Sequence, residues 1–170
     1  MRLFFFGSLM DLDLLALVIG RPVDDLATAE AALHGFERRR AVGESFPVIV
    51  PHPGGWVDGL LVDGLTAADL DRIQFFEGSD YALHPFAVAC AAQRIEVQVS
   101  LPTARLEAEP SAWDFAAWAE TERAMCFALA EELMAQYGGL SIAEIDVLWP
   151  EMKVRAERRF RLRRKGRRRA

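Results

Sequence analysis

Leu3-Phe4-Phe5-Phe6-Gly7-Ser8-Leu9 opens the chain and decides how the rest of it is interpreted. The apolar and aromatic run over residues 2–6 stops at Gly7-Ser8, which predicts a buried strand followed by a turn. Backbone N–H groups of such a turn lack strand partners, and a glycine lets a ligand approach the backbone closely. We therefore take Phe6, Gly7, Ser8 and Leu9 as a candidate binding loop, although an ordinary turn would have the same sequence.

A second informative stretch runs from Leu70 to Tyr81 and contains Phe75-Phe76-Glu77-Gly78. Thr66-Ala67-Ala68-Asp69 has the pattern of a helix-capping box, so we expect a helix from there to near Gly78. Glu77 then lies at the end of an apolar helix, directly after two phenylalanines. Aromatic neighbours that exclude water would raise the pKa of its carboxyl and allow proton transfer near neutral pH. A solvated glutamate before a glycine is the plainer interpretation of this stretch alone.

The remaining segments alternate between helical and extended patterns. Asp11 can cap a short helix to Ile19, and a long amphipathic helix is expected over 113–136. Residues 27–41 are ambiguous, because their alanine-rich composition favours a helix that Gly35 would interrupt. Ser141-Ile142-Ala143-Glu144 predicts another capping box, and Pro150 is expected to separate a short helix from a basic C-terminal one. Strands are expected at 46–50, 57–65, 86–91 and 95–101, with turns at 51–55 and at Gln93-Arg94. This order predicts an α+β protein with a mixed or antiparallel sheet.

Taken together and in order, the two stretches resemble the gamma-glutamylcyclotransferase family. Its members typically open with a strand ending in Tyr-Gly-Ser/Thr-Leu, and carry a later helix that ends in Leu-Asp-x-x-Glu-Gly and is followed by Tyr. The counterparts here are Phe6-Gly7-Ser8-Leu9, Ile73-Gln74-Phe75-Phe76-Glu77-Gly78 and Tyr81. The resemblance covers residues 2 to about 101 and includes Leu33-His34-Gly35-Phe36, Phe46-Pro47-Val48-Ile49-Val50 and Val57-Asp58-Gly59-Leu60-Leu61-Val62.

The resemblance implies a fold as well. Residues 1–110 would form a gamma-glutamylcyclotransferase-like domain, a small mixed or antiparallel β-barrel with helices around it. On this basis residues 27–41 are expected to be a strand. Residues 111–170 would form a helical extension that packs on this domain and ends in a basic tail.

The resemblance also implies a reaction on a small γ-glutamyl substrate. The α-amine of a γ-glutamyl group attacks its own γ-carbonyl, which forms 5-oxoproline and releases an amine or amino acid. Glu77 would be the general acid/base, and neither a metal nor a cofactor is needed. Phe6, Gly7, Ser8 and Leu9 would bind the substrate, and Tyr81 would line the pocket or belong to the core. A non-catalytic small-molecule-binding module on the same fold is the alternative.

Departures from the family pattern occur at Phe6, Ile73-Gln74, Leu83-His84-Pro85 and Val97-Gln98-Val99-Ser100.

The net charge of −5 is unevenly distributed along the chain. Residues 1–150 hold 9 of the 20 Lys+Arg and 23 of the 25 Asp+Glu, whereas residues 151–170 hold the other basic groups and only two acidic ones. We expect this basic tail to be a helix that docks on the acidic body or on a neighbouring subunit of a homo-oligomer. Nucleic-acid binding is not favoured, because Phe160 is the one aromatic residue in the tail.

The composition argues against several other classes. No apolar run is long enough to span a bilayer, and residues 1–6 are too short for a signal peptide, so we expect a cytoplasmic protein without membrane contact. Cys90 and Cys126 form no C-x-x-C pattern and the three histidines are scattered, which argues against a disulfide scaffold or a metal site. A cysteine nucleophile is a rival hypothesis, but both cysteines lie in apolar segments typical of inert thiols. Arg38-Arg39-Arg40 is expected to be a solvated face, with recognition of an acidic partner as the alternative.

Overall fold

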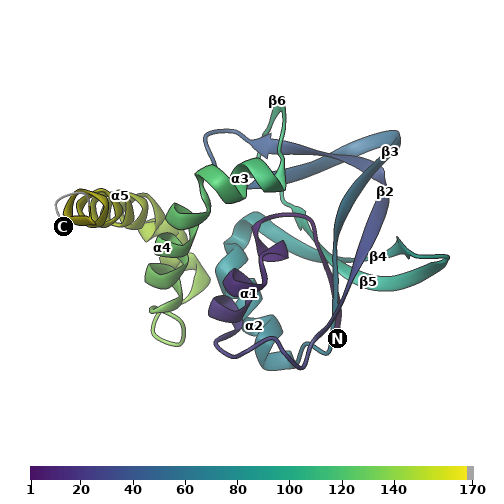
Figure 1. Ribbon diagram of the computed structural model, residues 1–170, viewed down its shortest axis with the longest axis horizontal. Coiled ribbons are helices and arrows are strands. Elements are labelled where there is room, and N and C mark those ends of the chain that lie inside the picture. The colour runs from purple at the N-terminus through teal and green to yellow at the C-terminus, as the bar shows by residue number, and fades with distance from the viewer. Residues whose placement is uncertain (168–170) are drawn as a thin grey trace.

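The computed structural model describes residues 1–167 of the chain, with side chains up to residue 161. A small closed barrel of five strands forms its centre, with a sixth strand added at one edge and helices packed outside (Figure 1). The predicted α+β barrel with a helical C-terminal extension is confirmed. The strands are β1 (Arg2–Phe5), β2 (Ala27–Ala41), β3 (Pro47–Asp63), β4 (Tyr81–Cys90), β5 (Gln93–Pro102) and β6 (Ala108–Ala112). The helices are α1 (Leu12–Ile19), α2 (Ala67–Glu77), α3 (Phe115–Thr121), α4 (Arg123–Met134) and α5 (Ile142–Arg167), with 3₁₀ turns η1 (Ser8–Met10) and η2 (Gly78–Asp80).

The barrel closes because β3 is paired on both sides. The strand order of the barrel, β3-β1-β5-β4-β2, returns to β3 through a long antiparallel pairing of β2 with β3. β1 and β5 run parallel, while the other neighbouring strands run antiparallel. β6 pairs with the end of β2 and so extends the sheet beyond the barrel. The sheet is therefore mixed, and closure protects strand edges that would otherwise be exposed.

β2 and β3 form a longer ribbon than the sequence predicts. Residues 27–41 are one strand, which confirms the assignment made from the family resemblance. The separate strands predicted at 46–50 and 57–65 are wrong, because both belong to the continuous β3. The expected turn at 51–55 is a bulge in this strand, since the register moves from His34↔Trp56 to Phe36↔Pro51. Proline and glycine clusters mark bulges as well as turns.

The hairpin of β4 and β5 also differs from its prediction. β4 begins at Tyr81 instead of Phe86, and Gln93 already pairs with Cys90. The turn therefore falls at Ala91-Ala92, where Ala91 has a φ of 51°, and not at Gln93-Arg94. The sequence does not predict β6, because its short segment contains Pro110 and has a polar composition typical of a loop.

Helix starts follow the capping patterns in the sequence. The Asp11 side chain accepts a hydrogen bond from the backbone N–H of Leu14 at the start of α1. Thr66 and Asp69 form the predicted capping box of α2, with the Asp69 carboxylate 2.8 Å from the Thr66 nitrogen. Ser141 and Glu144 do the same for α5. These local contacts satisfy N–H groups that a helix leaves unpaired at its start.

The single helix predicted over 113–136 is wrong, because the chain forms two helices that meet at Glu122. Trp113 precedes α3, whose first turn is capped by Asp114. The break lets Trp118 of α3 and Leu133 of α4 both reach the same hydrophobic cluster. Side-chain periodicity alone does not locate such a break, since each half keeps a helical pattern.

α5 continues through Pro150, where the sequence predicts a break. Proline removes one backbone hydrogen bond of the helix. Ile145 on one side of it, and Met152 and Ala156 on the other, are nevertheless buried at helical spacing on one face. Their burial offsets the lost bond and keeps the helix continuous. Within residues 1–167, no helix has the length and apolar character needed to cross a membrane.

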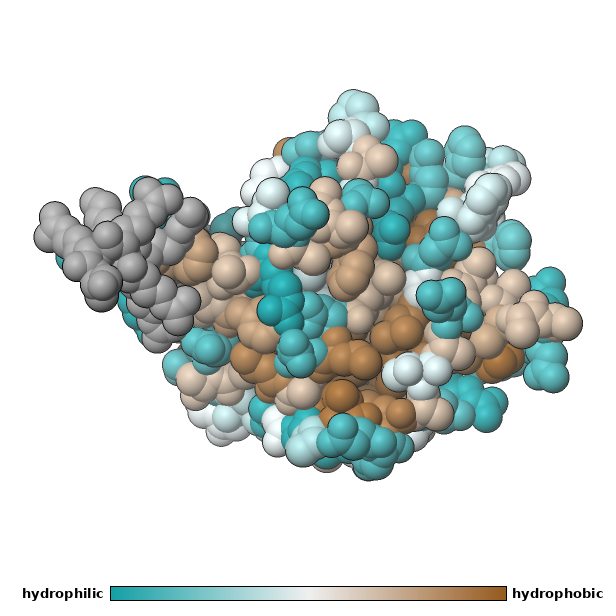
Figure 2. Space-filling view, viewed as in Figure 1, coloured by the Kyte–Doolittle hydropathy of each residue, from teal (hydrophilic) through white to brown (hydrophobic). Residues whose placement is uncertain are grey.

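The hydrophobic core has two clusters, divided by β1. Phe4 and Phe6 face the interior of the barrel, whereas Leu3 and Phe5 face the helices. Successive strand residues point to opposite faces, which explains why β1 is apolar throughout. The cluster outside the barrel includes residues from both sides of position 110, where the domain boundary stays a prediction. Figure 2 shows one face of the molecule, on which hydrophobic residues gather near the centre and hydrophilic ones lie around them.

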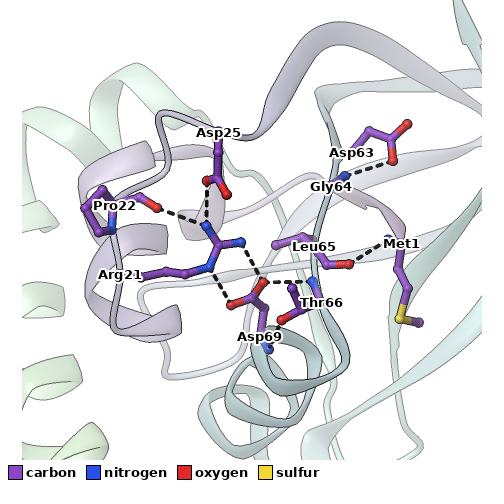
Figure 3. Close-up of polar contacts among 9 residues, drawn as sticks. All are labelled: Met1, Arg21, Pro22, Asp25, Asp63, Gly64, Leu65, Thr66 and Asp69. Carbon is purple, nitrogen blue, oxygen red and sulfur yellow. Dashed lines mark hydrogen bonds and ion pairs between the residues drawn. The ribbon is translucent and has the colours of Figure 1, made fainter.

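A partly buried ion pair anchors the start of α2 (Figure 3). Asp69 is 3% exposed, and the Arg21 guanidinium donates to its two carboxylate oxygens at 3.0 and 2.7 Å. These hydrogen bonds lower the pKa of the Asp69 carboxyl to about 2. The N-terminal ammonium of Met1 donates to the carbonyl of Leu65 at 2.6 Å, just before the helix. The position of α2 is thus fixed at one end, and Glu77 lies at the other.

Candidate active site

A cavity of about 330 Å³ is lined by both the barrel and the C-terminal helices. This volume lies in the range of about 300–1,000 Å³ typical of small-molecule sites. The lining comes from the end of β1 and the turn after it, the end of α2, the loop before β3, and parts of α4 and α5. The structure brings all the site residues singled out in the sequence to this one cavity, namely Phe6, Gly7, Ser8, Leu9, Glu77 and Tyr81.

Glu77 is the last residue of α2 and lines the cavity. Gly78, with a φ of 67°, ends the helix and turns the chain into η2. Burial raises the pKa of the Glu77 carboxyl to about 7, because the protein interior disfavours the charged form. Among the side chains up to residue 161, none forms an ion pair or hydrogen bond with this carboxylate. The group therefore titrates near neutral pH and is open to a ligand.

The turn after β1 lines the same cavity. The carbonyls of Gly7 and Ser8 accept from Met10 and Asp11, both at 3.0 Å. Within the described part of the chain, the N–H groups of Gly7, Ser8 and Leu9 donate to no other residue. A methyl group on Gly7 would lie 3.0 Å from the Pro47 side chain, so the glycine permits close packing of the turn against the start of β3.

Arg38 supports this turn from β2, a role that the sequence does not reveal. Its Nη1 donates to the carbonyl of Phe6 at 2.9 Å, and its guanidinium lies 5.2 Å from the ring centre of Trp113. The expectation of a solvated arginine face is therefore wrong. The two following arginines are also half-buried and pair within the chain, in the contacts Arg39–Glu37 and Arg40–Glu122. Alternation along a strand was the available signal, because it places Arg38 and Arg40 on one face.

Tyr81 lies between the cavity and the interior of the barrel. Its hydroxyl donates to the carbonyl of Pro47 at 2.7 Å, and its ring meets Phe46 edge-on at 6.1 Å. Burial, followed by the negative charge of Glu77, raises the pKa of the Tyr81 phenol. Tyr81 thus lines the cavity and packs against the barrel core at once, so both of the roles considered from sequence apply to it.

Two ion pairs lie where α5 meets the body of the protein beside the cavity. Lys153 Nζ is 2.7 Å from a carboxylate oxygen of Glu44, and Arg105 is 3.1 Å from Asp146. All four residues contribute to the lining. These contacts join the C-terminal helix to the loop before β3 and to the segment after β5.

Further along α5, two arginines bind one buried acid on α4. Arg155 and Arg159 lie 2.9 and 2.6 Å from the two carboxylate oxygens of Glu132, which is 9% exposed. The described part of the basic tail therefore docks on the acidic body of its own chain. This is one of the two arrangements expected from the charge distribution, and it leaves the oligomeric state a prediction.

α4 and α5 close the cavity with apolar side chains, which the sequence predicts only as packing contacts. We call this surface the helical wall, and it consists of Met125, Leu129, Leu133, Ile145 and Trp149. Most of these side chains keep some exposure, because they face the cavity. An apolar helix face has the same sequence pattern whether it packs on a neighbour or lines a site, so periodicity could not identify this wall.

Cys126 also lines the cavity, next to Ser8. Burial raises the pKa of its thiol to about 12, so the thiol is protonated at neutral pH. Because the thiolate is the nucleophilic form, this argues against the hypothesis of a cysteine nucleophile. Cys90 lies in β4 and is partly buried against the barrel core. Within the described side chains, no group of three or more His, Cys, Asp or Glu could hold a metal ion.

The family profile described as gamma-glutamyl cyclotransferase, AIG2-like, matches residues 3–118. The chain belongs to this family. Protein AIG2 C of Arabidopsis thaliana is 29% identical over 123 residues, which cover 69% of this chain and 71% of that protein. AIG2-like protein A of the same plant is 32% identical over 80 residues, 47% of each chain. The resemblance seen in the sequence motifs is thus confirmed at the level of the family.

Solved structures share the fold of this AIG2-like chain. The solution structure of an Arabidopsis thaliana protein matches with a TM-score of 0.57 at 25% identity and covers 80% of this chain and 82% of its own. A structure named gamma-glutamyl cyclotransferase matches with a TM-score of 0.51 at 18% identity and covers 86% of this chain and 85% of its own. This second likeness shows the fold alone.

The departures from the family motifs lie at different distances from the cavity. Ile73 is 1% exposed and fills the core, whereas Gln74 is exposed on α2 and does not line the cavity. Leu83 packs against the outer cluster, and His84 is exposed. Phe6 and Ser100 do line the cavity, so these two positions are where the departures alter its chemistry.

Proposed function

We propose that this AIG2-like protein cyclises a γ-glutamyl amide or peptide to 5-oxoproline and releases an amine or amino acid, with Glu77 as the general acid/base. One observation carries the proposal. An unpaired carboxyl whose pKa is raised to about 7 shares a cavity with the unpaired N–H groups of the Gly7–Leu9 turn. A proton acceptor and a set of oxygen-binding donors are the two elements that this reaction requires.

The reaction needs one proton to move twice. The α-ammonium of the substrate first loses one proton to water. The resulting amine forms a C–N bond with the γ-carbonyl carbon, and ionised Glu77 takes a second proton from this nitrogen as the bond forms. Glu77 then gives that proton to the leaving nitrogen as its bond to the same carbon breaks. The carboxylate is regenerated, and the products are 5-oxoproline and the free amine. A carboxyl with a pKa near the working pH serves in both directions.

The turn at Gly7–Leu9 would bind the oxygens of the substrate. Its N–H groups can donate to the γ-carbonyl oxygen, which becomes negatively charged as the ring forms, or to the α-carboxylate. Arg38 holds the Phe6 carbonyl and so limits movement of the turn. Because amine and carbonyl already belong to one molecule, the protein chiefly has to hold the folded conformer. Tyr81 would form part of the surface against which that conformer packs.

A non-catalytic binding module on this fold remains the second candidate function from the sequence. It would need the cavity and the turn but no proton acceptor. A solvated Glu77 would favour the module, whereas a carboxyl shielded from bulk solvent and open to the cavity favours the enzyme. The raised pKa of Glu77 comes from burial and therefore supports the enzyme.

The test is incubation with a panel of γ-glutamyl amino acids and amines, with 5-oxoproline measured over time. We expect the wild type to form 5-oxoproline and Glu77→Gln to lose about 10²-fold to 10⁴-fold of that rate, the usual contribution of a general acid/base. Glutamine fills the same volume but does not accept the proton, so ligand binding should persist.

Glu120→Gln is the matched control, because Glu120 is an exposed acid on α3 outside the cavity. It should keep the wild-type rate. If Glu77→Gln formed 5-oxoproline at the wild-type rate, the role of Glu77 as general acid/base would be refuted. Binding of a γ-glutamyl compound by a wild type that forms no 5-oxoproline would establish the binding module instead.

A further inference from the structure

The cavity presents two chemically different surfaces to a substrate. The groups proposed for the reaction, Glu77 and the Gly7–Leu9 turn, lie on one side. The helical wall of α4 and α5 is a second part of the lining, and its five side chains are all hydrocarbon, thioether or indole. If the glutamyl group occupies the side of Glu77 and the turn, the rest of the substrate has the helical wall as its neighbour.

The charged groups around this wall are already paired. Lys153 binds Glu44, and Arg105 binds Asp146. Glu157, which also lines the cavity, lies 3.3 Å from Arg161 on the next helical turn. Recruiting any of these charges for a polar leaving group would require breaking an existing ion pair, whereas apolar contact with the wall requires no such exchange.

The helical wall is held in place before any ligand binds. Glu132 of α4 binds both Arg155 and Arg159 of α5, which locks the two helices together. Asp146 contacts Ser79 directly after the end of α2, so the first turns of α5 are fixed close to Glu77. A preformed apolar surface loses little conformational freedom when a ligand packs on it.

α4 and α5 lie outside the segment that matches the family. The profile ends at residue 118, and every residue of the helical wall follows it. Glu77 and the Gly7–Leu9 turn belong to the segment that matches the family, but the helical wall does not. The wall is therefore where this chain can set its own preference among γ-glutamyl compounds.

We infer that the helical wall is the subsite for the leaving group, and that this protein favours γ-glutamyl compounds whose released amine or amino acid carries a large aromatic or aliphatic side chain. This inference rests on the proposed function. Burial of the side chain against Leu129 and Trp149 would orient the scissile bond toward Glu77 as well as add affinity. Trp149 and Leu129 are then specificity-determining residues, separate from the catalytic machinery.

The experiment compares γ-glutamyl-phenylalanine with γ-glutamyl-glycine in the wild type. We expect kcat/KM for the phenylalanine compound to be higher by about 10-fold or more, as is typical for an apolar pocket that distinguishes side chains by size. Trp149→Ala and Leu129→Ala should each reduce this ratio, mainly through slower turnover of the phenylalanine compound. Trp149→Phe, which keeps an aromatic ring, should retain most of it.

Val147→Ala is the matched control, because Val147 lies on the same helix and is 78% exposed. Its ratio should equal that of the wild type, and thermal melts should show that all variants are folded. Equal kcat/KM for the two compounds, or a ratio unaffected by both alanine variants, would overturn the subsite while leaving the proposed function intact. Absence of 5-oxoproline from every compound would overturn the proposed function, and the subsite would fall with it.

Discussion

The barrel side of the cavity and its helical wall differ in the kind of contact that they offer. The barrel side provides a titratable carboxyl and backbone N–H groups, both fixed by the ends of regular elements, β1 and α2. The helical wall provides apolar side chains on α4 and α5, and side-chain ion pairs join α5 to the loop before β3 and to the segment after β5. The residues proposed for the reaction thus lie in the part of the chain that matches the family, and the proposed leaving-group subsite lies in the part that does not.

The two sides should also differ in how well they tolerate substitutions. β1 and β3 are paired neighbours in the closed barrel, so their backbones are in direct contact. The C-terminal helices contact the barrel through side chains, which can adjust. Substitutions of the same kind should therefore have unequal effects in the two regions.

Glycine-to-alanine substitutions should show the largest contrast. A methyl group at Gly59 in β3 would lie 2.3 Å from the carbonyl oxygen of Phe5 and 2.5 Å from the ring of Phe4. Gly59→Ala should lower the free energy of unfolding by more than about 3 kcal/mol, measured by urea denaturation, or prevent folding altogether. Gly139→Ala, between α4 and α5, meets nothing closer than 3.5 Å and should change it by less than about 0.5 kcal/mol. Equal effects of the two substitutions would contradict the contrast.

Acid-to-amide substitutions in two ion pairs should differ less in their effect on stability, and the difference should depend on how buried each acid is. The pKa of Asp69 is lowered to about 2 by Arg21, so the stabilisation from this carboxylate is present above about pH 4 and is lost as the pH falls toward 2. Asp69→Asn should therefore cost about 1–2 kcal/mol at pH 7, measured by denaturant titration, and much less at pH 2.

Asp63→Asn provides the comparison for Asp69. Asp63 pairs with Arg2, but both side chains are exposed, at 39% and 54%. Water and salt screen exposed pairs, so this substitution should have a clearly smaller effect at pH 7. A larger loss from Asp63→Asn than from Asp69→Asn would show that burial does not govern the contribution of these pairs.

The sequence predicts those parts of the structure that depend on local pattern. The apolar run of β1 and the three caps at Asp11, Thr66 and Ser141 are governed by residues a few positions apart. The two site motifs could be found because each ends a regular element at a glycine, Gly7 or Gly78. Their joint occurrence also predicted the strand at 27–41, which composition alone left open.

The features of the structure that the sequence does not predict depend on contacts between distant segments. The continuity of α5 through Pro150 results from burial of Met152 and Ala156 on the body, which no local rule contains. The contact of Arg38 with the Phe6 carbonyl joins residues 32 positions apart. The helical wall exists only because α4 and α5 pack around a space instead of filling it. Cytoplasmic location stays a prediction from the sequence.

The central claim is that Glu77 titrates near neutral pH inside the cavity, and direct titration tests it. The carboxyl carbon of Glu77 can be followed by ¹³C NMR across pH 3 to 9 in the folded protein, and Glu77→Gln identifies its signal by removing it. Because burial disfavours the charged carboxylate, we expect a pKa of about 7. A pKa near the usual value of 4.5 would contradict the account, since such a group would be ionised throughout the working range and a poor proton donor to the leaving amine.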